Sequence, residues 1–278
     1  MILIFSSVGG LCNQFYDIIN AINFCVYHNY QFSFKYCEFR NKNLTTWVYE
    51  DFNKLFDLSD LINTYKNLFI DINLIKMTEE NTYNFSNKNL NKLFDNTDVI
   101  SVLNKIDKEY IMIPWFHVIN RFRNIEIHGL NKKILPSIRL INLYNNIKNK
   151  LLDNNEKYNF IHYRYEHDFT RCFDIKIEPF KDLYLRIKNN FKNTTLKIYI
   201  ATSNFKSIID LNDIDVNDPD FNQIITKNED ELVDYNFEEL AFIDFMFGKN
   251  SEEVYGHHKS SFSHMLWHIT GNVLCYSN

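Results

Sequence analysis

A group of ionisable side chains follows an apolar stretch in the middle of the chain. His162, Arg164, Glu166 and Asp168 occur at every second position, after apolar residues that begin at Tyr158. The alternation predicts a buried strand with large side chains on both faces, and it puts His162 and Arg164 on the same face. A planar guanidinium group can bind two phosphate oxygens at once and stays charged at any working pH, so Arg164 is a candidate anion-binding residue.

The neighbouring elements are expected to place this group at the edge of a sheet. A helical pattern follows from about Glu178 to Phe191, and another apolar strand runs from Leu196 to Ala201. Strand, helix and strand in this order predict a β-α-β unit in a parallel sheet. Ligands of such sheets bind beyond the carboxyl ends of the strands, which is where the ionisable group lies.

A glycine pair near the amino terminus separates an expected strand, residues 1–6, from an expected helix, residues 13–27. Gly9 and Gly10 have no Cβ atoms, so the backbone can approach a ligand closely, and the helix start can offer free N–H groups to an anion. Asn13 stands at this helix start. A simple tight turn between strand and helix is the alternative interpretation.

Two further groups lie near the carboxyl terminus. Asp244 is a lone carboxylate among apolar neighbours in an expected helix. Three serines and a phenylalanine open another expected helix, and hydroxyl and N–H groups at a helix start suit a phosphate group. The members of this serine cluster are Ser260, Ser261, Phe262 and Ser263. Ordinary helix capping by one of the serines explains the cluster as well.

The rest of the chain reads as alternating strands and helices on either side of a boundary near Pro136. Further expected strands are 31–36, 109–115, 158–164, 196–202, 253–255 and 272–276, and further expected helices are 51–63, 138–152, 178–191, 203–211, 229–248 and 261–269. Residues 77–98 are polar and weakly periodic, which predicts a surface loop with short helices.

The three blocks of candidate residues resemble the motifs of the O-fucosyltransferase-like glycosyltransferases. Val8–Gln14 is similar to the Gly-Gly-x-x-Asn-Gln loop with which those enzymes begin, and His162–Asp168 is similar to their His-x-Arg-x-Glu-x-Asp motif. Asp244 with the later Ser260–Ser263 turn is similar to their third block. The blocks follow the family's order and cover nearly the whole chain.

This resemblance implies an α/β protein of the GT-B fold, with two Rossmann-like halves facing across a cleft. Residues 1–136 would form the acceptor-side half, and residues 137–278 would form the sugar-nucleotide-binding half. The implied reaction is an inverting, metal-independent transfer of a sugar from a GDP-sugar to a hydroxyl group of a glycan or protein. Among GDP-sugars, GDP-fucose is the expected donor. No cofactor and no metal are expected.

The resemblance also implies roles for single residues. Arg164 would neutralise the leaving diphosphate, unless it forms a salt bridge within the protein. His162 would contact the nucleotide, unless it is a hydrogen-bonded core histidine, and Asp244 would bind guanine, unless it faces solvent. Glu166 is the first candidate for the base that takes the acceptor's proton, with Asn13 in support. The other donor-binding candidates are Gly9, Gly10, Asp168, Ser260, Ser261, Phe262 and Ser263.

Several alternatives stay open. The α-1,2-fucosyltransferases have a similar first loop and a Ser-Ser-Phe-Ser turn, and plant-type relatives use a rhamnose nucleotide. A protein without turnover, which binds nucleotide sugars or glycans or has a structural role, is the alternative from another class. Two departures from the family's pattern bear on these choices: Cys12 replaces a residue that is often Gly or Asn, and residues 28–130 carry no motif.

Composition excludes some classes of protein. The apolar fraction of 45% is that of a globular chain, and the net charge of −5 argues against a general nucleic-acid binder. No run of about 20 apolar residues predicts a membrane span, and the start shows no basic segment with a cleavage site. We therefore expect a cytoplasmic protein without a membrane span.

Metal sites and disulfides are not expected either. The Asp213–Asp215 and Asp218–Asp220 pairs lie in a polar stretch and are interpreted as solvated turn residues, and His264 with His268 is a weak zinc candidate. Five cysteines, an odd number without C-x-x-C spacing, predict free thiols.

Overall fold

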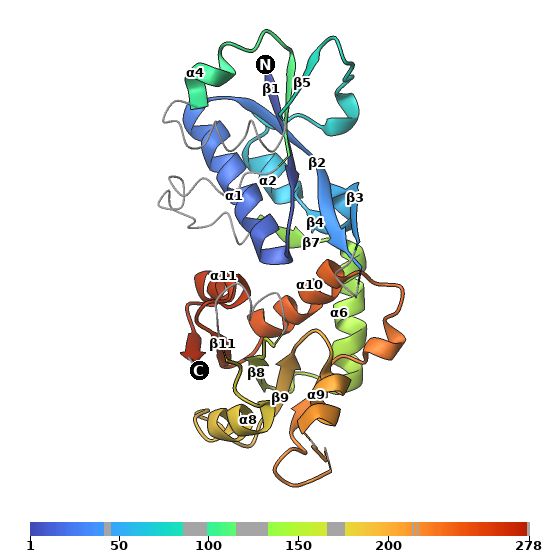
Figure 1. Cartoon of the computed structure of the whole chain (residues 1–278), viewed down its shortest axis with the longest axis vertical. Coiled ribbons are helices and arrows are strands. Elements are labelled where there is room, and N and C mark those ends of the chain that lie inside the picture. Colours follow the sequence, from blue (N-terminus) through green and yellow to red (C-terminus); the bar gives the residue numbers. More distant parts are fainter. Residues whose placement is uncertain are drawn as a thin grey trace. The chain divides into compact units, whose positions relative to one another are not determined.

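A computed structural model describes residues 1–41, 46–85, 99–114, 133–165, 176–212, 214–215 and 217–276. The chain consists of two compact units, Met1–Ile138 and Arg139–Asn278 (Figure 1). Each unit contains a five-stranded sheet with helices packed against it. The architecture is therefore α/β in both units, as the sequence predicts.

The sheet of the N-terminal unit has the order β3-β2-β1-β6-β5. Its strands are β1 (Ile2–Ser7), β2 (Gln31–Arg40), β3 (Trp47–Asp51), β5 (Thr82–Asn84) and β6 (Tyr110–Ile113), and β3 alone among them pairs antiparallel. The short strands β4 (Phe56–Asp57) and β7 (Leu135–Pro136) pair separately. The remaining elements are α2 (Ser59–Thr64), α4 (Val99–Leu103) and the 3-10 turns η1 (Phe52–Lys54) and η2 (Ile72–Leu74).

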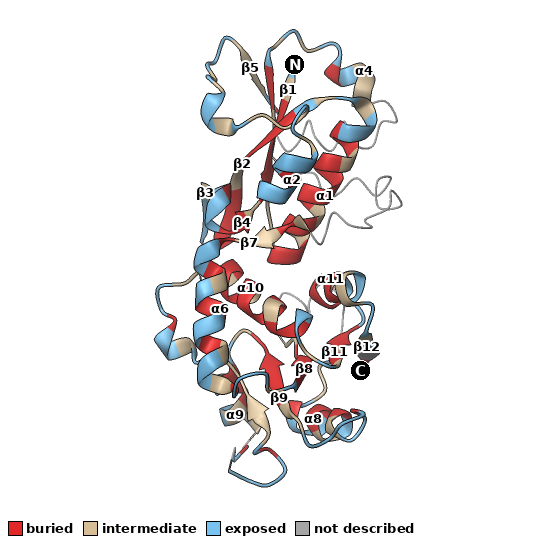
Figure 2. Cartoon of the chain, turned by 180° about the vertical axis from the view of Figure 1, so that it is seen from behind, coloured by how far each residue is buried: buried red, intermediate tan, exposed pale blue. Residues whose placement is uncertain are grey.

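Helix α1 (Leu11–His28) covers this sheet with an apolar face (Figure 2). Phe15, Ile18, Ile19 and Ile22 recur at helical spacing and are fully buried or nearly so. The helix ends at Asn29, whose φ of 57° is the left-handed conformation typical of a helix C-cap. The first strand-loop-helix unit thus follows directly from its pattern.

The sheet of the C-terminal unit has the order β10-β9-β8-β11-β12, and all its pairs are parallel. Its strands are β8 (Tyr158–His162), β9 (Lys197–Ala201), β10 (Ile224–Ile225), β11 (Val254–His257) and β12 (Val273–Tyr276). The helical elements are α6 (Ile138–Leu151), α8 (Phe180–Lys188), α9 (Phe205–Asn212), η4 (Glu229–Glu231), α10 (Phe237–Lys249) and α11 (Ser261–Thr270). This is the Rossmann-like alternation that the second half predicts.

Strand β8 is buried on both faces. Phe160 stacks on Tyr199 of β9, with ring centroids 5.9 Å apart. On the opposite face, Ile161 joins the core cluster formed with α8 and α9, which includes Phe180 and Tyr184. The expectation of large side chains on both faces of an interior strand is confirmed.

Two expected elements differ in extent. The helix expected over 229–248 is divided into η4 and α10, because Asn236 and Glu239 form a capping box that starts α10 at Phe237. The strand expected over 158–164 ends at His162. Within the expected loop 77–98, β5 forms a short strand, and residues 86–98 lie outside the described part of the chain.

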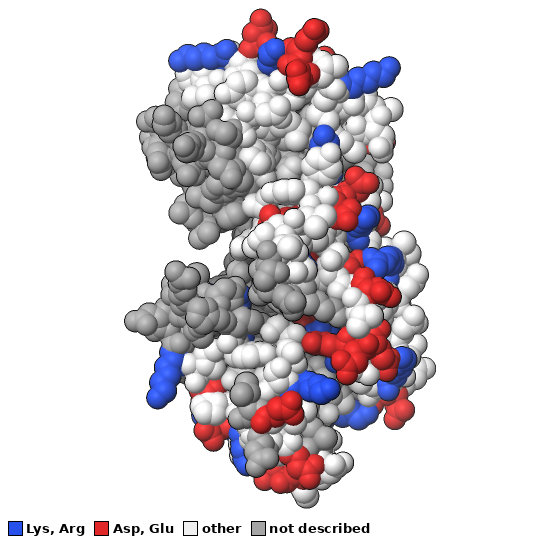
Figure 3. Space-filling view, turned by 45° about the vertical axis from the view of Figure 1, so that its right-hand side comes forward, with Lys and Arg blue, Asp and Glu red and all other residues white. Residues whose placement is uncertain are grey.

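Charge and thiols agree with the composition. Lys and Arg side chains are interspersed with Asp and Glu on the face drawn in Figure 3. Cys12, Cys25 and Cys37 are buried thiols that take part in no disulfide. Among the described residues, no helix is both long enough and apolar enough to span a membrane.

Candidate active site

The candidate site lies at the carboxyl edge of the C-terminal sheet. Strands β8 and β11 are neighbours there, with Gly256 opposite His162. Arg164 follows the end of β8, and the serine cluster follows the end of β11 and opens α11. Two sequence blocks about 100 residues apart are thus joined by one strand pair.

Gly256 allows α11 to dock against the end of this strand pair. A Cβ atom at this position would lie 2.3 Å from Ser263 Oγ, which is closer than two atoms can approach. With hydrogen there instead, Ser263 Oγ lies 3.0 Å from His162 Nδ1, and the Phe262 ring lies 4.4 Å from the imidazole ring. The glycine therefore fixes where the first turn of α11 sits.

His162 is a neutral member of this site. Burial lowers the pKa of its imidazole well below the ordinary value, and the nearby positive charges of Arg164, His257 and Lys227 lower it further. Only 8% of the residue is exposed, and its carbonyl oxygen accepts a hydrogen bond from Tyr276. His162 is thus a buried, hydrogen-bonded histidine that also stands at the edge of the site.

His257 is a site residue that the motif analysis did not select. Its Nδ1 accepts a hydrogen bond from the Lys259 amide at 3.1 Å, so the proton of the neutral ring is on Nε2. Burial first, then the charges of His258, Lys259 and Arg164, lower the pKa of His257 to about 4. Its place at the end of an expected strand was the signal that could have found it.

Ser260 begins α11 with a buried hydroxyl group. It occupies the N-cap position, yet its side chain makes no capping hydrogen bond. The residue is 0% exposed, and Ser260 Oγ has no hydrogen-bond partner in the described part of the chain. Helix capping therefore does not explain why this hydroxyl is buried at the helix N-terminus.

Arg164 is the cationic group of this edge. It is half-buried, and its charge depresses the pKa values of both His162 and His257. The guanidinium group therefore acts electrostatically on the same two rings that border α11. Glu166 and Asp168, the other members of the motif, lie outside the described residues.

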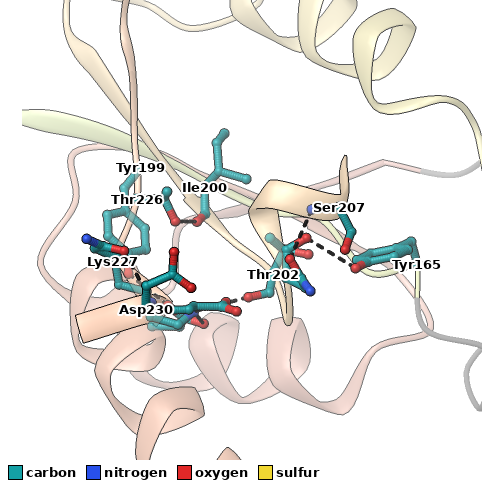
Figure 4. A network of polar contacts seen from close by, with 12 residues as sticks. Tyr165, Tyr199, Ile200, Thr202, Ser207, Thr226, Lys227 and Asp230 are labelled. Carbon is teal, nitrogen blue, oxygen red and sulfur yellow. Dashed lines mark hydrogen bonds and ion pairs between the residues drawn. The ribbon is translucent and has the colours of Figure 1, made fainter. Parts of the chain in front are cut away.

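Asp244 belongs to a buried polar network beyond the ends of β9 and β10. One carboxylate oxygen accepts a hydrogen bond from the Tyr199 hydroxyl at 2.8 Å, and the other accepts one from Lys227 Nζ at 2.7 Å. Lys227 also donates to the Thr202 carbonyl at 3.1 Å (Figure 4). The interpretation of Asp244 as a solvent-facing helix residue is wrong, because only 6% of it is exposed.

The network holds its charges in fixed places. Burial, followed by the charge of Asp244 and the hydrogen bond to it, raises the pKa of Tyr199, so this hydroxyl stays a donor. Lys227 is buried and was not expected at the site, since it lies in a stretch without a motif. Its charge is also one of those that keep His162 neutral.

The loop of the N-terminal unit is organised differently. Gly9 has a φ of +82°, which favours glycine, and its amide donates to Glu38 Oε2 at 2.6 Å. The Val8 amide donates to Asp17 Oδ2 at 3.0 Å. Gln14 bonds the carbonyl oxygens of Gly9 and Glu38. Two amides of the loop that precedes the helix are thus satisfied by the protein's own carboxylates.

Asn13 lies directly beside this loop. Its Nδ2 is 3.2 Å from where a Cβ atom on Gly9 would stand. Side chains larger than hydrogen at Gly9 would therefore press on Asn13. The glycine pair accommodates neighbouring side chains as well as a turn.

The aspartate pairs and histidines that were considered as metal ligands do not gather into a metal site within the described part of the chain. No three His, Cys, Asp or Glu side chains gather as a metal site among the residues that the structure describes. Asp215 and Asp218 are exposed turn residues whose carboxylates accept the amides of Asn217 and Asp220. His264 Nε2 bonds the His258 carbonyl oxygen at 2.6 Å.

Comparison with known proteins gives a consistent result for the fold. No protein-family model and no curated protein matches the sequence. The chain is similar to the crystal structure of POFUT1 in complex with GDP, with a TM-score of 0.64 and 10% identity over 100% of this chain and 99% of that one.

Two structures of a second protein agree. NodZ alpha-1,6-fucosyltransferase co-crystallized with GDP has a TM-score of 0.63 and 11% identity over 100% of this chain and 95% of that one. Fucosyltransferase NodZ from Bradyrhizobium has a TM-score of 0.61 and 10% identity over 99% and 96%. The chain therefore has the GT-B fold of these fucosyltransferases, the fold that the resemblance of its motifs implies.

Proposed function

We propose that this protein is a glycosyltransferase that moves L-fucose from GDP-fucose to a hydroxyl group of a glycan or protein, with inversion at the anomeric carbon and without a metal ion. Residues 1–136 would serve the acceptor and residues 137–278 the donor. The fold shared with NodZ alpha-1,6-fucosyltransferase and with POFUT1 in complex with GDP-fucose supports this proposal.

One observation carries the proposal: an anion-binding edge in the C-terminal unit. Ser260 Oγ is buried without a described partner at the N-terminus of α11, and Arg164 stands at the end of the adjacent strand. A helix N-terminus, a hydroxyl donor and a guanidinium group are the groups that bind a diphosphate without metal. His162, neutral and hydrogen-bonded to Ser263 in the first turn of α11, adds a polar group without adding charge.

In the proposed reaction the acceptor oxygen bonds to the anomeric carbon while the bond from that carbon to the β-phosphate oxygen breaks. Negative charge develops on the departing GDP, and Arg164 with the first turn of α11 would stabilise it. The hydroxyl proton would pass to a base, for which Glu166 is the candidate, with Asn13 in support. Opposite faces of the sugar are used for attack and departure, so the configuration inverts.

The other donor contacts are proposed from the same arrangement. Asp244 would accept hydrogen bonds from guanine, since each carboxylate oxygen has more than one lone pair and can accept a further bond beside that from Lys227. Ser261, Phe262 and Ser263 would border the nucleotide together with Asp168. Gly9 and Gly10 would let the loop backbone approach the donor.

Thermal unfolding with GDP, UDP, ADP and GMP tests the donor site, and incubation with GDP-fucose tests turnover. A nucleotide at 100 times its Kd adds about 2.7 kcal/mol to stability. We expect GDP to stabilise the protein most and GDP-fucose to be hydrolysed or transferred. Stabilisation by GDP without turnover would indicate a binding protein, and stabilisation by UDP in place of GDP would overturn the donor assignment.

A further inference from the structure

A hairpin of the N-terminal unit extends beyond the carboxyl edge of its sheet. Strand β2 runs three residues past the last pair with β1, and β3 pairs antiparallel with that extension. Glu38 is opposite Tyr49, and Arg40 is opposite Trp47. Directly opposed residues point to the same face, so these four side chains form one group, here called the hairpin patch.

The two charged members of the hairpin patch are held firmly. Glu38 is 8% exposed and accepts the Gly9 amide at 2.6 Å. Arg40 is 9% exposed, lies over the Trp47 ring at 5.4 Å and reaches to within 2.9 Å of where a Cβ atom on Gly10 would stand. Buried charges at the edge of a sheet are costly, so their fixed placement indicates a built site.

The two aromatic members are open to solvent. Trp47 is 50% exposed and Tyr49 is 54% exposed, although each touches a buried charged residue. Burial, followed by the charge of Glu38 and a hydrogen bond to it, raises the pKa of the Tyr49 phenol. The rings are therefore oriented by polar partners while their apolar surface stays available.

We propose that the hairpin patch binds a saccharide. A sugar ring presents a face of C–H groups that packs on an aromatic ring, and around it hydroxyl groups that need both donors and acceptors. Trp47 and Tyr49 offer the aromatic surface, and the buried Arg40 and Glu38 support the two rings as neighbouring polar groups. One positive and one negative charge leave no net attraction for a charged ligand, which favours a neutral polyol.

The proposal extends the function proposed above. Its claim that the saccharide is the acceptor rests on that function, whereas its claim that the hairpin patch binds a saccharide does not. The site lies beyond the carboxyl ends of the parallel strands, where ligands of such sheets bind. It is built from the N-terminal unit alone. Acceptor choice would then fall on a glycan rather than on a bare peptide.

The experiment is a glycan array followed by isothermal titration calorimetry with the strongest array glycan. We expect glycan binding in the absence of GDP, and a loss of about tenfold or more in affinity for Trp47→Ala, the size of one aromatic stacking contact. Glu38→Gln keeps the shape of the side chain and should also weaken binding. Trp267→Ala is the matched control, because Trp267 is also 50% exposed but lies in α11.

Each outcome bears on one claim. Binding of unglycosylated Ser/Thr peptides but no glycan, or no glycan binding at all, overturns the saccharide site. A dimer in analytical ultracentrifugation that Trp47→Ala converts to a monomer also overturns it, since the patch is then an interface between copies. If GDP fails to stabilise the wild type while glycans bind and Trp47→Ala weakens them, the saccharide site stands and the transferase proposal fails.

Discussion

The carboxyl edges of the two sheets occupy equivalent places in the fold and differ in charge. In the C-terminal unit, Arg164 follows β8 and the buried Lys227 follows β10. In the N-terminal unit, the loop amides of Val8 and Gly9 donate to the carboxylates of Asp17 and Glu38. Both edges are followed by a helix start, α11 in one case and α1 in the other.

A glycine loop before a helix does not by itself leave amides free for an anion. The N-terminal loop gives the amides of Val8 and Gly9 to the protein's own carboxylates. The first turn of α11 instead keeps Ser260 Oγ buried and without a described partner. We therefore propose that the diphosphate belongs to the C-terminal edge, and that the N-terminal edge serves a ligand without strong charge.

The largest effect is expected for Lys227→Met, which tests whether the C-terminal edge is set by its buried network. Removing the ammonium group leaves Asp244 buried without its ion-pair partner, which costs roughly 3–5 kcal/mol, or on the order of 10 °C in the unfolding midpoint. Thermal unfolding measures this shift of the midpoint. Lys150→Met is the control, since its pair with Glu231 is exposed and is worth about 0–1 kcal/mol. Equal effects of the two variants would contradict the assignment.

Arg164→Ala addresses the contrast between the edges directly. If Arg164 binds the leaving diphosphate as proposed, its loss should reduce fucose transfer by about 10²- to 10³-fold and remove the stabilisation by GDP. Arg186→Ala is the matched control, because Arg186 is a partly exposed arginine of the same unit that pairs with Glu178. Loss of GDP binding in Glu38→Gln but not in Arg164→Ala would contradict the proposed difference between the two edges.

Ser260→Ala separates ligand binding from folding. Its hydroxyl makes no described hydrogen bond, so stability without ligand should change by less than about 1 kcal/mol, while GDP affinity should fall by about tenfold through loss of a bond to a charged group. Ser263→Ala should lower stability without ligand as well, because Ser263 Oγ bonds His162. Titration calorimetry and urea unfolding measure the two quantities, and a large loss of stability in Ser260→Ala would argue against the site.

The last prediction concerns pH. His162 and His257 have lowered pKa values in the folded protein, that of His257 to about 4, so below the ordinary value of 6.5 the unfolded chain binds protons that the native protein does not. Stability should therefore be fully present above 6.5 and fall as the pH drops, by up to about 1.4 kcal/mol per pH unit for each such group.

The measurement is thermal unfolding between pH 7 and pH 4.5. His257→Gln should have a shallower slope than wild type, whereas His268→Gln, which removes an exposed histidine, should not. A slope unchanged by His257→Gln would mean that other groups dominate acid unfolding.

The periodic parts of the fold could be predicted from sequence, and parts that depend on pairing could not. The helices and the parallel strands of the C-terminal unit carry their own apolar pattern, so most of their bounds follow from it. Strand β3 does not alternate in this way, because Trp47 and Tyr49 are exposed and its order comes from pairing with β2. The start of α10 could have been predicted from the sequence, since Asn236 and Glu239 have capping-box spacing.

The candidate site also combines residues that could be predicted from the sequence with residues that could not. His162 and Arg164 could be selected because they end an apolar strand, and Ser260 because it precedes a helix. Lys227 and Arg40 could not, since an isolated lysine or arginine in a polar stretch is normally a solvated surface residue. Their burial is decided by partners 17 residues away for Lys227 and across a hairpin for Arg40.

The close approach of Ser263 to Gly256 also constrains how this chain can evolve. A methyl group at position 256 is excluded while a serine stands at 263, and a change at 263 alone would remove the bond to His162. Substitutions at the two positions are therefore epistatic, so that each becomes tolerable only after the other has changed. Descendants of this sequence should exchange the two residues together or keep both.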